Sequence, residues 1–449
     1  MIGIIFLGFC FLQLIYIYFF IRNKYFRFIS FFLIVLFIQP VFQKLTDPSL
    51  VGSTFEIITL ARIKTNIIII VGLSLILLIK KLPKIYSRSV IRFYYGFMIF
   101  IILSVLNVLF ALNVERSFNI MIVSVIGPFL LFNVLLKIPS KLFVNRVENL
   151  VDHLLYSVVF FFVLGYFYYY YQLGKLAFNS FEFIRGGGGI WISNISTQVM
   201  ILFFPLIFYK PFIKRHKVIF SMLVFFYFTL VIISLSRTAL LIYLIISILI
   251  VFRDRNKFLK RFRNLLLIFA GIYYAIFILL PNYNIDIEKL YKVRFEKKGN
   301  LVQTTLADER FVLSKTAVDN FIERPLMGAG LGDFIEINKP KYTNSHNIFT
   351  NILSERGLLL FLLFLLFIIY YFKLNKKISF HVYSKERGYL LWSLKTGFIG
   401  FILIGMTGND LFISSGFVNA WPSYIIIIFL TIQIKIYEEI YIFQSHYKR

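Results

Sequence analysis

Apolar stretches of about 15–25 residues recur along the whole chain and alternate with short polar segments. Each stretch is close to the length of helix that crosses the roughly 30 Å of hydrocarbon in a bilayer. The stretches are continuous and do not alternate residue by residue, which favours helices over the strands of a β-barrel. The pattern predicts an all-α, polytopic membrane protein in which residues 1–449 form a single integral membrane domain.

The predicted spans number twelve or thirteen, and two of them are short. The set of thirteen lies near residues 2–21, 28–43, 67–79, 93–112, 120–136, 154–173, 191–209, 218–236, 238–252, 264–280, 348–372, 389–407 and 419–437. The connection 281–345 is much longer than the others. Because long loops in compact proteins usually either carry function or are disordered, this loop is a candidate for function.

Basic residues are concentrated in alternate loops. Twenty-nine of the 48 Lys and Arg residues lie in one set of segments, whereas the short loops of the opposite set hold seven: the basic set comprises 22–27, 80–92, 137–153, 210–217, 253–263, 373–388 and the C-terminal segment from Lys435. Because basic loops stay on the cytoplasmic side, this set and the C-terminus are predicted to be cytoplasmic. The N-terminus and the long loop 281–345 are then extracytoplasmic.

Composition excludes several classes of protein. A hydrophobic fraction of 59% and a mean hydropathy of +0.81 are too high for a water-soluble domain of this length. A net charge of +27 would suggest nucleic-acid binding in a soluble protein, but the loop positions of the charges account for it, and we expect no nucleic-acid partner. The single cysteine, Cys10, lies in the first apolar stretch, so no disulfide framework is expected.

The end of the long loop has a distinct local pattern. In "LADERFVLSKTAVDNFIERP", apolar residues at Phe311, Val318, Phe321 and Ile322 recur close to helical spacing, and Pro325 ends the predicted helix. "PLMGAGLGDF" follows as a glycine-rich turn. No strand is predicted before these glycines, so they are weak evidence for a nucleotide site.

Three arginines on the predicted outer side are candidates for anion binding. Arg237, in "SLSRTALL", is predicted to lie at an outward-facing hairpin near the membrane surface, where it could also be a plain interfacial anchor. Arg310 lies on the predicted loop helix, where the alternative is a solvated charge. Arg185 opens "RGGGGIWISN", whose glycines either admit a close approach of the main chain or form a flexible link.

His346 lies where the long loop becomes a membrane helix, in "SHNIFTNILSERGLLLFL". Asn344 or Ser345 is predicted to cap that helix, and its N-terminal N–H groups would favour an anion beside His346. The alternative is a histidine with a capping or interfacial role. Glu355 and Arg356 follow about 13–15 Å further along the helix. We expect them to pair with each other or with a neighbouring helix, with a structural role for Arg356.

No resident metal or cofactor is expected. The sequence has no P-loop, no carboxylate dyad, no metal-ligand cluster and no Ser-His-Asp order, and its extracytoplasmic aspartates are scattered. A metal-dependent glycosyltransferase would be expected to carry an acidic motif in an outer loop.

The succession of "SLSRTALL", "ERFVLSKTAVDNFIERPLMGAGLGDF" and "SHNIFTNILSERGLLLFLLFL" resembles the bacterial O-antigen ligase and O-antigen polymerase superfamily. The resemblance covers about 230–370 and is only architectural elsewhere. It implies a GT-C-like membrane fold of about a dozen spans with one large extracytoplasmic loop. Two features depart from the family pattern: Ala329 stands between the first two glycines, and thirteen spans place the N-terminus outside.

The resemblance also implies roles for individual residues. Arg237 and Arg310 would bind the pyrophosphate of a donor glycan linked to a polyprenyl lipid such as undecaprenyl pyrophosphate, and His346 would act at the acceptor hydroxyl or on the same pyrophosphate. Arg185, Asn347 and Glu355 are further candidates for contacts with the substrate. The implied protein is a metal-independent glycosyltransferase of the inner membrane, with its active site on the extracytoplasmic face.

Two matters stay open at the level of sequence. The acceptor could be a second lipid-linked repeat unit, as for a surface polysaccharide polymerase, or a lipid A core, as for a ligase of lipopolysaccharide biosynthesis. The rival class is a flippase for the same lipid-linked oligosaccharide, which should show internal repeats or broken helices near the middle of the membrane. The sequence shows neither signal.

The predicted topology has a direct test. Single cysteines placed at Asn300 and Asn256, in a background that carries Cys10→Ser, are expected to react differently with a membrane-impermeant thiol reagent in intact cells whose outer membrane is permeable to it. Asn300→Cys should be labelled and Asn256→Cys should not, because the first lies in the long loop and the second in a basic loop. Labelling at position 256 alone would reverse the orientation.

Overall fold

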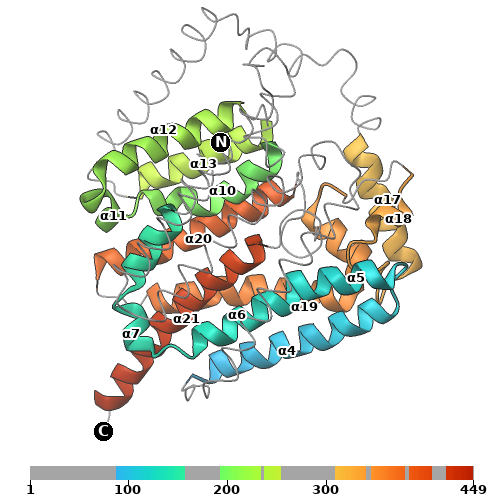
Figure 1. Cartoon of the computed structure of the whole chain (residues 1–449), viewed down its shortest axis with the longest axis horizontal. Coiled ribbons are helices and arrows are strands. Elements are labelled where there is room, and N and C mark those ends of the chain that lie inside the picture. The colour runs from blue at the N-terminus through green and yellow to red at the C-terminus, as the bar shows by residue number, and fades with distance from the viewer. Residues whose placement is uncertain are drawn as a thin grey trace, which may run out of the picture. The chain divides into compact units, whose positions relative to one another are not determined.

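The computed structural model describes residues 87–156, 193–233, 237–253, 309–339, 345–379, 384–406 and 421–447. Every regular element in these ranges is a helix, and no strand occurs in them (Figure 1). The prediction of an all-α, polytopic membrane protein is therefore confirmed. Arg185, Asn344 and the spans predicted near 2–21, 28–43, 67–79 and 264–280 lie outside the described residues.

Within the described ranges, four stretches are long and apolar enough to cross a membrane, judged by length and composition. They are Val90–Leu109, Val114–Leu136, Ile348–Ser379 and Lys385–Gly405, and a shorter apolar helix covers Thr238–Phe252. Each overlaps a span predicted from the sequence. The total of twelve or thirteen spans stays a prediction, since it depends also on residues outside these ranges.

The chain divides into two compact units, which are considered separately. One unit consists of residues 23–151, 307–395 and 405–449, and the other of residues 1–22, 152–306 and 396–404. The described helices of the first are α4 (Arg88–Leu109), α5 (Val114–Met121), the π-helix η2 (Ile122–Ile126), α6 (Gly127–Leu136), α7 (Ser140–Val144), α17 (Glu309–Glu323), α18 (Phe334–Ile337), α19 (Ile348–Ser379) and α21 (Trp421–Tyr447). The second contains α10 (Ser193–Ile207), α11 (Lys210–Arg215), α12 (Lys217–Ile233) and α13 (Arg237–Phe252). Helix α20 (Lys385–Gly405) contributes residues to both units.

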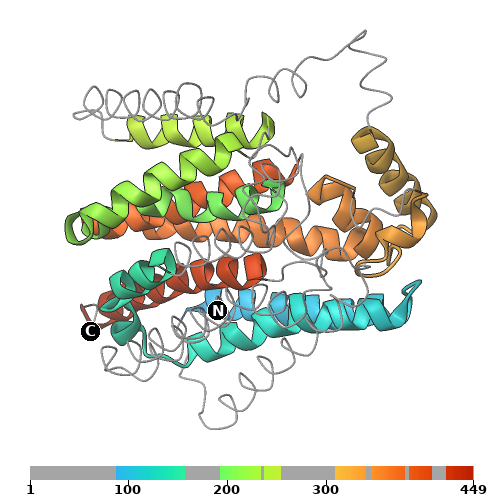
Figure 2. The same ribbon diagram turned by 45° about the horizontal axis from the view of Figure 1, so that its top comes forward.

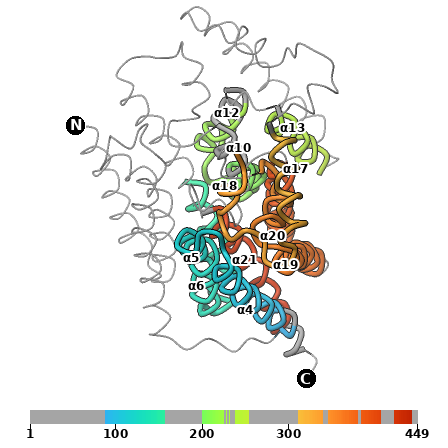
Figure 3. The backbone as a smooth tube through the Cα atoms, turned by 90° about the vertical axis from the view of Figure 1, so that its right-hand side faces the viewer, coloured from blue at the N-terminus to red at the C-terminus, as the bar shows by residue number. Residues whose placement is uncertain are grey.

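In the first unit, α21 is the central helix. It packs against α6, α7 and α19, while α4 packs against α19. Figure 3 shows α4, α6, α19 and α21 together, seen nearly end-on. Its residues from Tyr424 to Lys435 are buried without interruption. The ammonium group of Lys435 donates hydrogen bonds to the carbonyl oxygens of Leu136 at 2.8 Å and Ile138 at 2.5 Å. These bonds satisfy acceptors at and just beyond the end of α6, where the helix itself provides no donors.

In the second unit, aromatic rings and one glycine determine the packing. The ring of Phe204 on α10 lies 5.1 Å from that of Tyr243 on α13 and 5.6 Å from that of Tyr227 on α12. Gly397 of α20 approaches α10 so closely that a Cβ atom there would overlap the carbonyl group of Leu202. Small residues of this kind allow membrane helices to pack with their main chains close together.

Candidate functional site

Helix α17 confirms the helix predicted before Pro325, but its buried side is not the one that the apolar spacing indicated. Phe311, Val318 and Ile322 are 46%, 41% and 68% exposed. The buried residues are instead Leu313 and Ala317, which pack with Phe334 of α18. Along the buried side of α17, apolar residues alternate with polar residues that contact other segments. The spacing of the large apolar residues therefore does not identify the buried side of this helix.

Helix α19 contains a break at Gly357. Residues on both sides are helical, but Gly357 has φ 71° and ψ −176°, a conformation that is essentially restricted to glycine. The carbonyl groups of Ser354 and Glu355 consequently accept hydrogen bonds from other segments. The sequence shows no signal of a broken helix near the middle of the membrane, and the apolar pattern does not predict this break.

The glycine-rich turn fills this break with its own main chain. The N–H groups of Ala329 and Gly330 donate to the carbonyl oxygens of Ser354 and Glu355, both at 2.9 Å. In return, the N–H of Leu358 donates to the carbonyl of Pro325 at 2.8 Å. Residues 325–333, which we call the glycine turn, therefore dock on α19 through main-chain hydrogen bonds, and we call this contact the joint. Figure 2 shows α17 and α18, in gold, at the N-terminal end of the orange α19.

The two glycines that face each other across the joint have no room for a side chain. A Cβ atom at Gly328 would lie 2.5 Å from the carbonyl oxygen of Ser354, and one at Gly357 would overlap the main chain of Leu326 and Met327. Both glycines also have positive φ angles. The glycine turn thus has a structural role. This role accounts for its glycines without a nucleotide site, for which the sequence provides only weak evidence.

Two asparagine side chains complete the joint from neighbouring helices. Asn107 of α4 donates to the carbonyl of Glu355 at 3.0 Å and also contacts the carbonyl of Met327. Asn320 of α17 donates to the carbonyl of Ser354 at 2.8 Å. Main-chain acceptors that a broken helix leaves open inside a membrane protein must be satisfied by other groups. Here α4, α17 and the glycine turn satisfy them together.

The other side of the glycine turn is bound to the connection between α4 and α5. The N–H of Leu112 donates to the carbonyl of Ala329 at 2.8 Å, and the N–H of Asn113 donates to the carboxylate of Asp333 at 2.7 Å. Burial raises the pKa of Asp333 to about 6, although the hydrogen bond from Asn113 and the nearby guanidinium of Arg116 act in the opposite direction. The glycine turn is therefore held on two sides.

Glu355 and Arg356 lie inside the joint. Both side chains are fully buried, and the guanidinium carbon of Arg356 lies 5.8 Å from the centre of the Phe100 ring. The first exposed residues of α19 are Leu358 and Leu359, directly after Gly357. Protein therefore surrounds the two charged residues, and the apolar surface that suits contact with lipid begins only after the break. A contact of Glu355 with substrate stays a prediction.

His346 occupies a special main-chain conformation. Its φ angle is 58°, and it is the one residue other than glycine with a positive φ among the described residues. Asn and His tolerate this left-handed conformation better than most residues, but it is still uncommon. Residues in such conformations concentrate at functional sites, where the surrounding structure holds them in place. The His346 side chain is partly exposed.

A polar network holds the chain around His346. The N–H of Ser345 donates to the side chain of Asn351 at 3.0 Å, and the Ser345 hydroxyl lies 2.9 Å from that of Thr350. The side chain of Asn347 accepts from the N–H groups of Phe349 at 2.9 Å and Thr350 at 3.3 Å. Ser345 and Asn351 are fully buried, so the conformation of His346 is fixed on both sides.

This network corrects the predicted cap. Asn347, rather than Asn344 or Ser345, is the residue whose side chain caps α19. The left-handed turn at His346 delays the start of the helix to Ile348, and Asn347 then stands at the capping position. The N–H groups of residues 349 and 350 are engaged by Asn347, so the helix N-terminus is a less open anion site than the sequence suggested.

Arg310 and His346 lie on neighbouring segments. Ser314 of α17 donates from its hydroxyl to the carbonyl of Ser345 at 3.2 Å. Arg310 precedes Ser314 by four residues and therefore lies on the same face of the helix, about one turn away. The fold thus brings the Arg310 segment to the residue beside His346.

The remaining arginine candidates are not placed at this site. Arg237 is the first residue of α13 in the other unit, but its side chain lies outside the described part of the chain. Arg185 lies outside it entirely. No group of three metal-binding side chains occurs in the ranges that the structure describes.

Comparison with known proteins concerns the same region. Residues 222–365 match the model of a protein family described as O-antigen ligase. This third of the chain is similar to that family, which supports the resemblance to the O-antigen ligase and polymerase superfamily. The matched residues include Arg237, Arg310, the glycine turn, His346 and Gly357. No curated protein matches the chain.

The O-antigen ligase match supports a membrane protein with an activity of the O-antigen ligase or polymerase type, which is a transfer of glycan. Sequence reasoning missed Asn107 and Asn320, which hold the joint, and Asp333, which holds the glycine turn to the connection between α4 and α5. No motif marks these residues, since their roles depend on contacts with segments far away along the chain. The glycines were visible in the sequence, but their partner in α19 was not.

The joint predicts that Gly357→Ala is strongly destabilising. Alanine at φ 71° costs of order 1–3 kcal/mol in the main chain alone, and its Cβ would overlap the glycine turn. The expected result is a lower midpoint of thermal unfolding for the purified protein in detergent. Gly388→Ala is the matched control, because a Cβ atom at Gly388 meets no other atom within 4 Å. Equal midpoints for the two variants would contradict the role of the joint.

Proposed function

We propose that the protein transfers an oligo- or polysaccharide from a polyprenyl pyrophosphate donor to a sugar hydroxyl at the extracytoplasmic face of the inner membrane. The observation that carries the proposal is the hydrogen bond from Ser314 to Ser345, which ties the segment of Arg310 to the strained turn of His346. Both segments belong to the region that matches the O-antigen ligase family.

In this proposal, guanidinium groups hold the leaving group. The pyrophosphate gains negative charge as the bond from its oxygen to C1 of the sugar breaks, and a guanidinium fork matches two of its oxygens at once. Cations that are already in position lower the barrier, because they stabilise charge that develops in the transition state. Arg310 would supply one such group and Arg237 the second, so that no metal ion is required.

His346 would act as the general base. A neutral imidazole near pH 7 can accept the proton of the acceptor hydroxyl while that oxygen attacks C1. The new glycosidic bond forms as the old bond to pyrophosphate breaks, and the polyprenyl pyrophosphate leaves with its two phosphates intact. The fixed left-handed turn at His346 supports this role, since it holds the main chain of this residue at one position relative to the Arg310 segment.

The identity of the acceptor decides whether the proposed activity is that of a polymerase or that of a ligase. A polymerase would use another lipid-linked repeat unit, whereas a ligase would use a lipid A core or another carrier. Analysis of the surface glycan from a strain that lacks the gene separates them. Single repeat units on the acceptor indicate a lost polymerase, and a finished polymer that remains on the polyprenyl lipid indicates a lost ligase.

The break in α19 is a feature expected of the rival class, the lipid-linked oligosaccharide flippases, because broken helices form substrate sites in many transporters. Here, however, the carbonyl groups at the break are engaged by Ala329, Gly330, Asn107 and Asn320. A break filled in this way serves to dock a loop, and these carbonyl groups are not left open to a cargo. The transferase is therefore the better-supported proposal.

The role of Arg310 predicts that Arg310→Ala abolishes glycan transfer while the protein still inserts into the membrane. Arg310→Lys should retain little activity, because one ammonium group cannot make the same pair of hydrogen bonds. Arg324→Ala is a suitable control, since Arg324 is exposed just beyond the other end of α17. Transfer would be measured with purified protein and a polyprenyl pyrophosphate donor. Near-normal transfer by Arg310→Ala would remove this residue from the site.

The role of His346 predicts a loss of rate without a loss of fold. His346→Asn is the most informative variant, because asparagine also tolerates a left-handed main chain but cannot act as a base near pH 7. It should accumulate in the membrane like wild type and lose about 10²–10⁴ in rate. His346→Ala and His346→Gln should fail as well.

The same set of variants separates the base from other roles. Substantial transfer by His346→Asn or His346→Gln would show that the imidazole acts through hydrogen bonds, and Glu355 would then be the next candidate base. Full activity per molecule in all three variants would leave His346 with a structural role only. Loss of protein from the membrane, with normal turnover of what remains, would lead to the same conclusion.

A further inference from the structure

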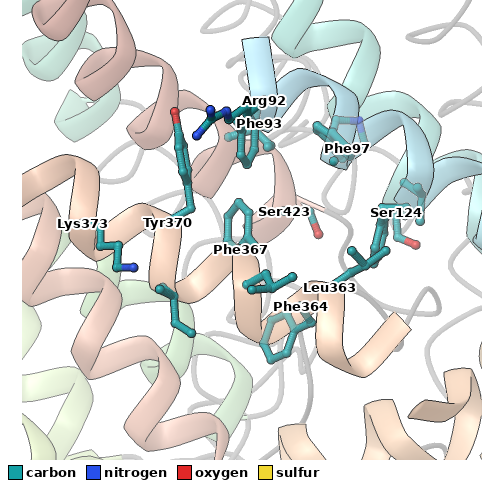
Figure 4. Close-up of a pocket in the computed structure, with 17 residues that line it drawn as sticks. Arg92, Phe93, Phe97, Ser124, Leu363, Phe364, Phe367, Tyr370, Lys373 and Ser423 are labelled. Atoms are coloured by element: carbon teal, nitrogen blue, oxygen red, sulfur yellow. The ribbon is translucent and has the colours of Figure 1, made fainter. Parts of the chain in front are cut away.

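A cavity of about 540 Å³ lies in the first unit between α4, α19, α21 and the junction of η2 and α6 (Figure 4). Its volume is within the range of about 300–1,000 Å³ that is typical of ligand sites. Most of its lining is apolar, with aromatic rings from α4 and α19. It is separate from the glycine turn and from His346, neither of which lines it.

One wall of the cavity is open because of a glycine. A Cβ atom at Gly96 of α4 would meet no other atom within 4 Å. The rings of Phe93 on α4 and Tyr370 on α19 stack nearby, with centres 4.7 Å apart and planes at 18°. A Cβ atom at position 96 would therefore extend into space that is now empty.

The cavity has a basic end. Helices α4 and α19 run in opposite directions, since Phe93 pairs with Tyr370 whereas Phe100 lies against Arg356. Arg92 and Lys373, which both line the cavity and are exposed, therefore mark the same end of it. The charge pattern of the loops predicts that this end faces the cytoplasm.

The cavity also has an apolar rim. Leu366 and Ile369 of α19 line it and are 57% and 47% exposed. In a membrane helix, exposed apolar side chains face hydrocarbon. An apolar chain could therefore enter the cavity sideways from the bilayer, while its polar head stayed at the level of Arg92 and Lys373.

We propose that this cavity binds one anionic phospholipid of the cytoplasmic leaflet. Arg92 and Lys373 would hold the phosphate, and an acyl chain would lie along Gly96 between the aromatic rings. Basic pockets between membrane helices on the cytoplasmic side are suited to anionic lipid heads. This site goes beyond the proposed transfer, because the reacting pyrophosphate would lie at the opposite face of the membrane.

The test is native mass spectrometry of the full-length protein in detergent, with phosphatidylglycerol or phosphatidylcholine added at matched concentrations. Wild type should bind phosphatidylglycerol about tenfold more tightly than phosphatidylcholine. The double variant Arg92→Gln with Lys373→Gln should lose this preference. Arg88→Gln is the control, because Arg88 is exposed on the same helix but does not line the cavity.

A second variant tests the position of the acyl chain. Gly96→Leu should narrow the cavity where the acyl chain would lie and weaken the binding of both lipids at least tenfold, whereas Gly388→Leu, at a site equally open in α20, should bind like wild type. Unchanged binding by Gly96→Leu would overturn the proposal, as would equal affinity of wild type for the two lipids. A polyprenyl phosphate that copurifies at one per protein and is displaced by neither lipid would overturn the choice of phospholipid. None of these measurements uses glycan transfer, so their failure is distinct from a failure of the proposed function.

Discussion

The contact between the glycine turn and the break in α19 is the constraint on which the rest of this region depends. Two segments exchange main-chain hydrogen bonds there, and Gly328 and Gly357 are positions where no side chain fits. Where the main chain leaves a helix inside a membrane protein, its N–H and carbonyl groups must find other hydrogen-bond partners. Each group left without a partner would cost free energy. The glycine turn supplies them and thereby fixes where the loop meets the membrane helix.

The position of His346 follows from this contact. The turn brings α17 onto α19, and α17 then reaches the start of α19 through the hydrogen bond from Ser314 to Ser345. Without the joint, the Arg310 segment would be an ordinary loop helix with no fixed relation to His346. A site that acts on a charged leaving group needs such a fixed relation, because catalysis by preformed charges depends on their being in place beforehand.

The two ends of α19 are suited to different surroundings. Up to Arg356, its buried residues include Asn351, Ser354 and Glu355, which polar partners can satisfy. Beyond Gly357, exposed leucines alternate with aromatic rings that line the cavity. One helix therefore contributes both to a polar assembly at the predicted outer face and to an apolar chamber deeper in the bundle, and Gly357 is the boundary between them.

Local composition was enough to predict the helical membrane class, most of the helix positions in the described ranges, and the residues that carry the family resemblance. A long apolar stretch has few alternatives to a membrane helix, so this information is present in each segment alone. It took the packed molecule to reveal that the glycine turn docks on Gly357, that Asn347 caps α19, and that the exposed side of α17 bears its large apolar residues. Those outcomes depend on pairs of residues that lie far apart in the chain, such as Asn107 and Glu355, whose separation in sequence carries no signal of their contact in space.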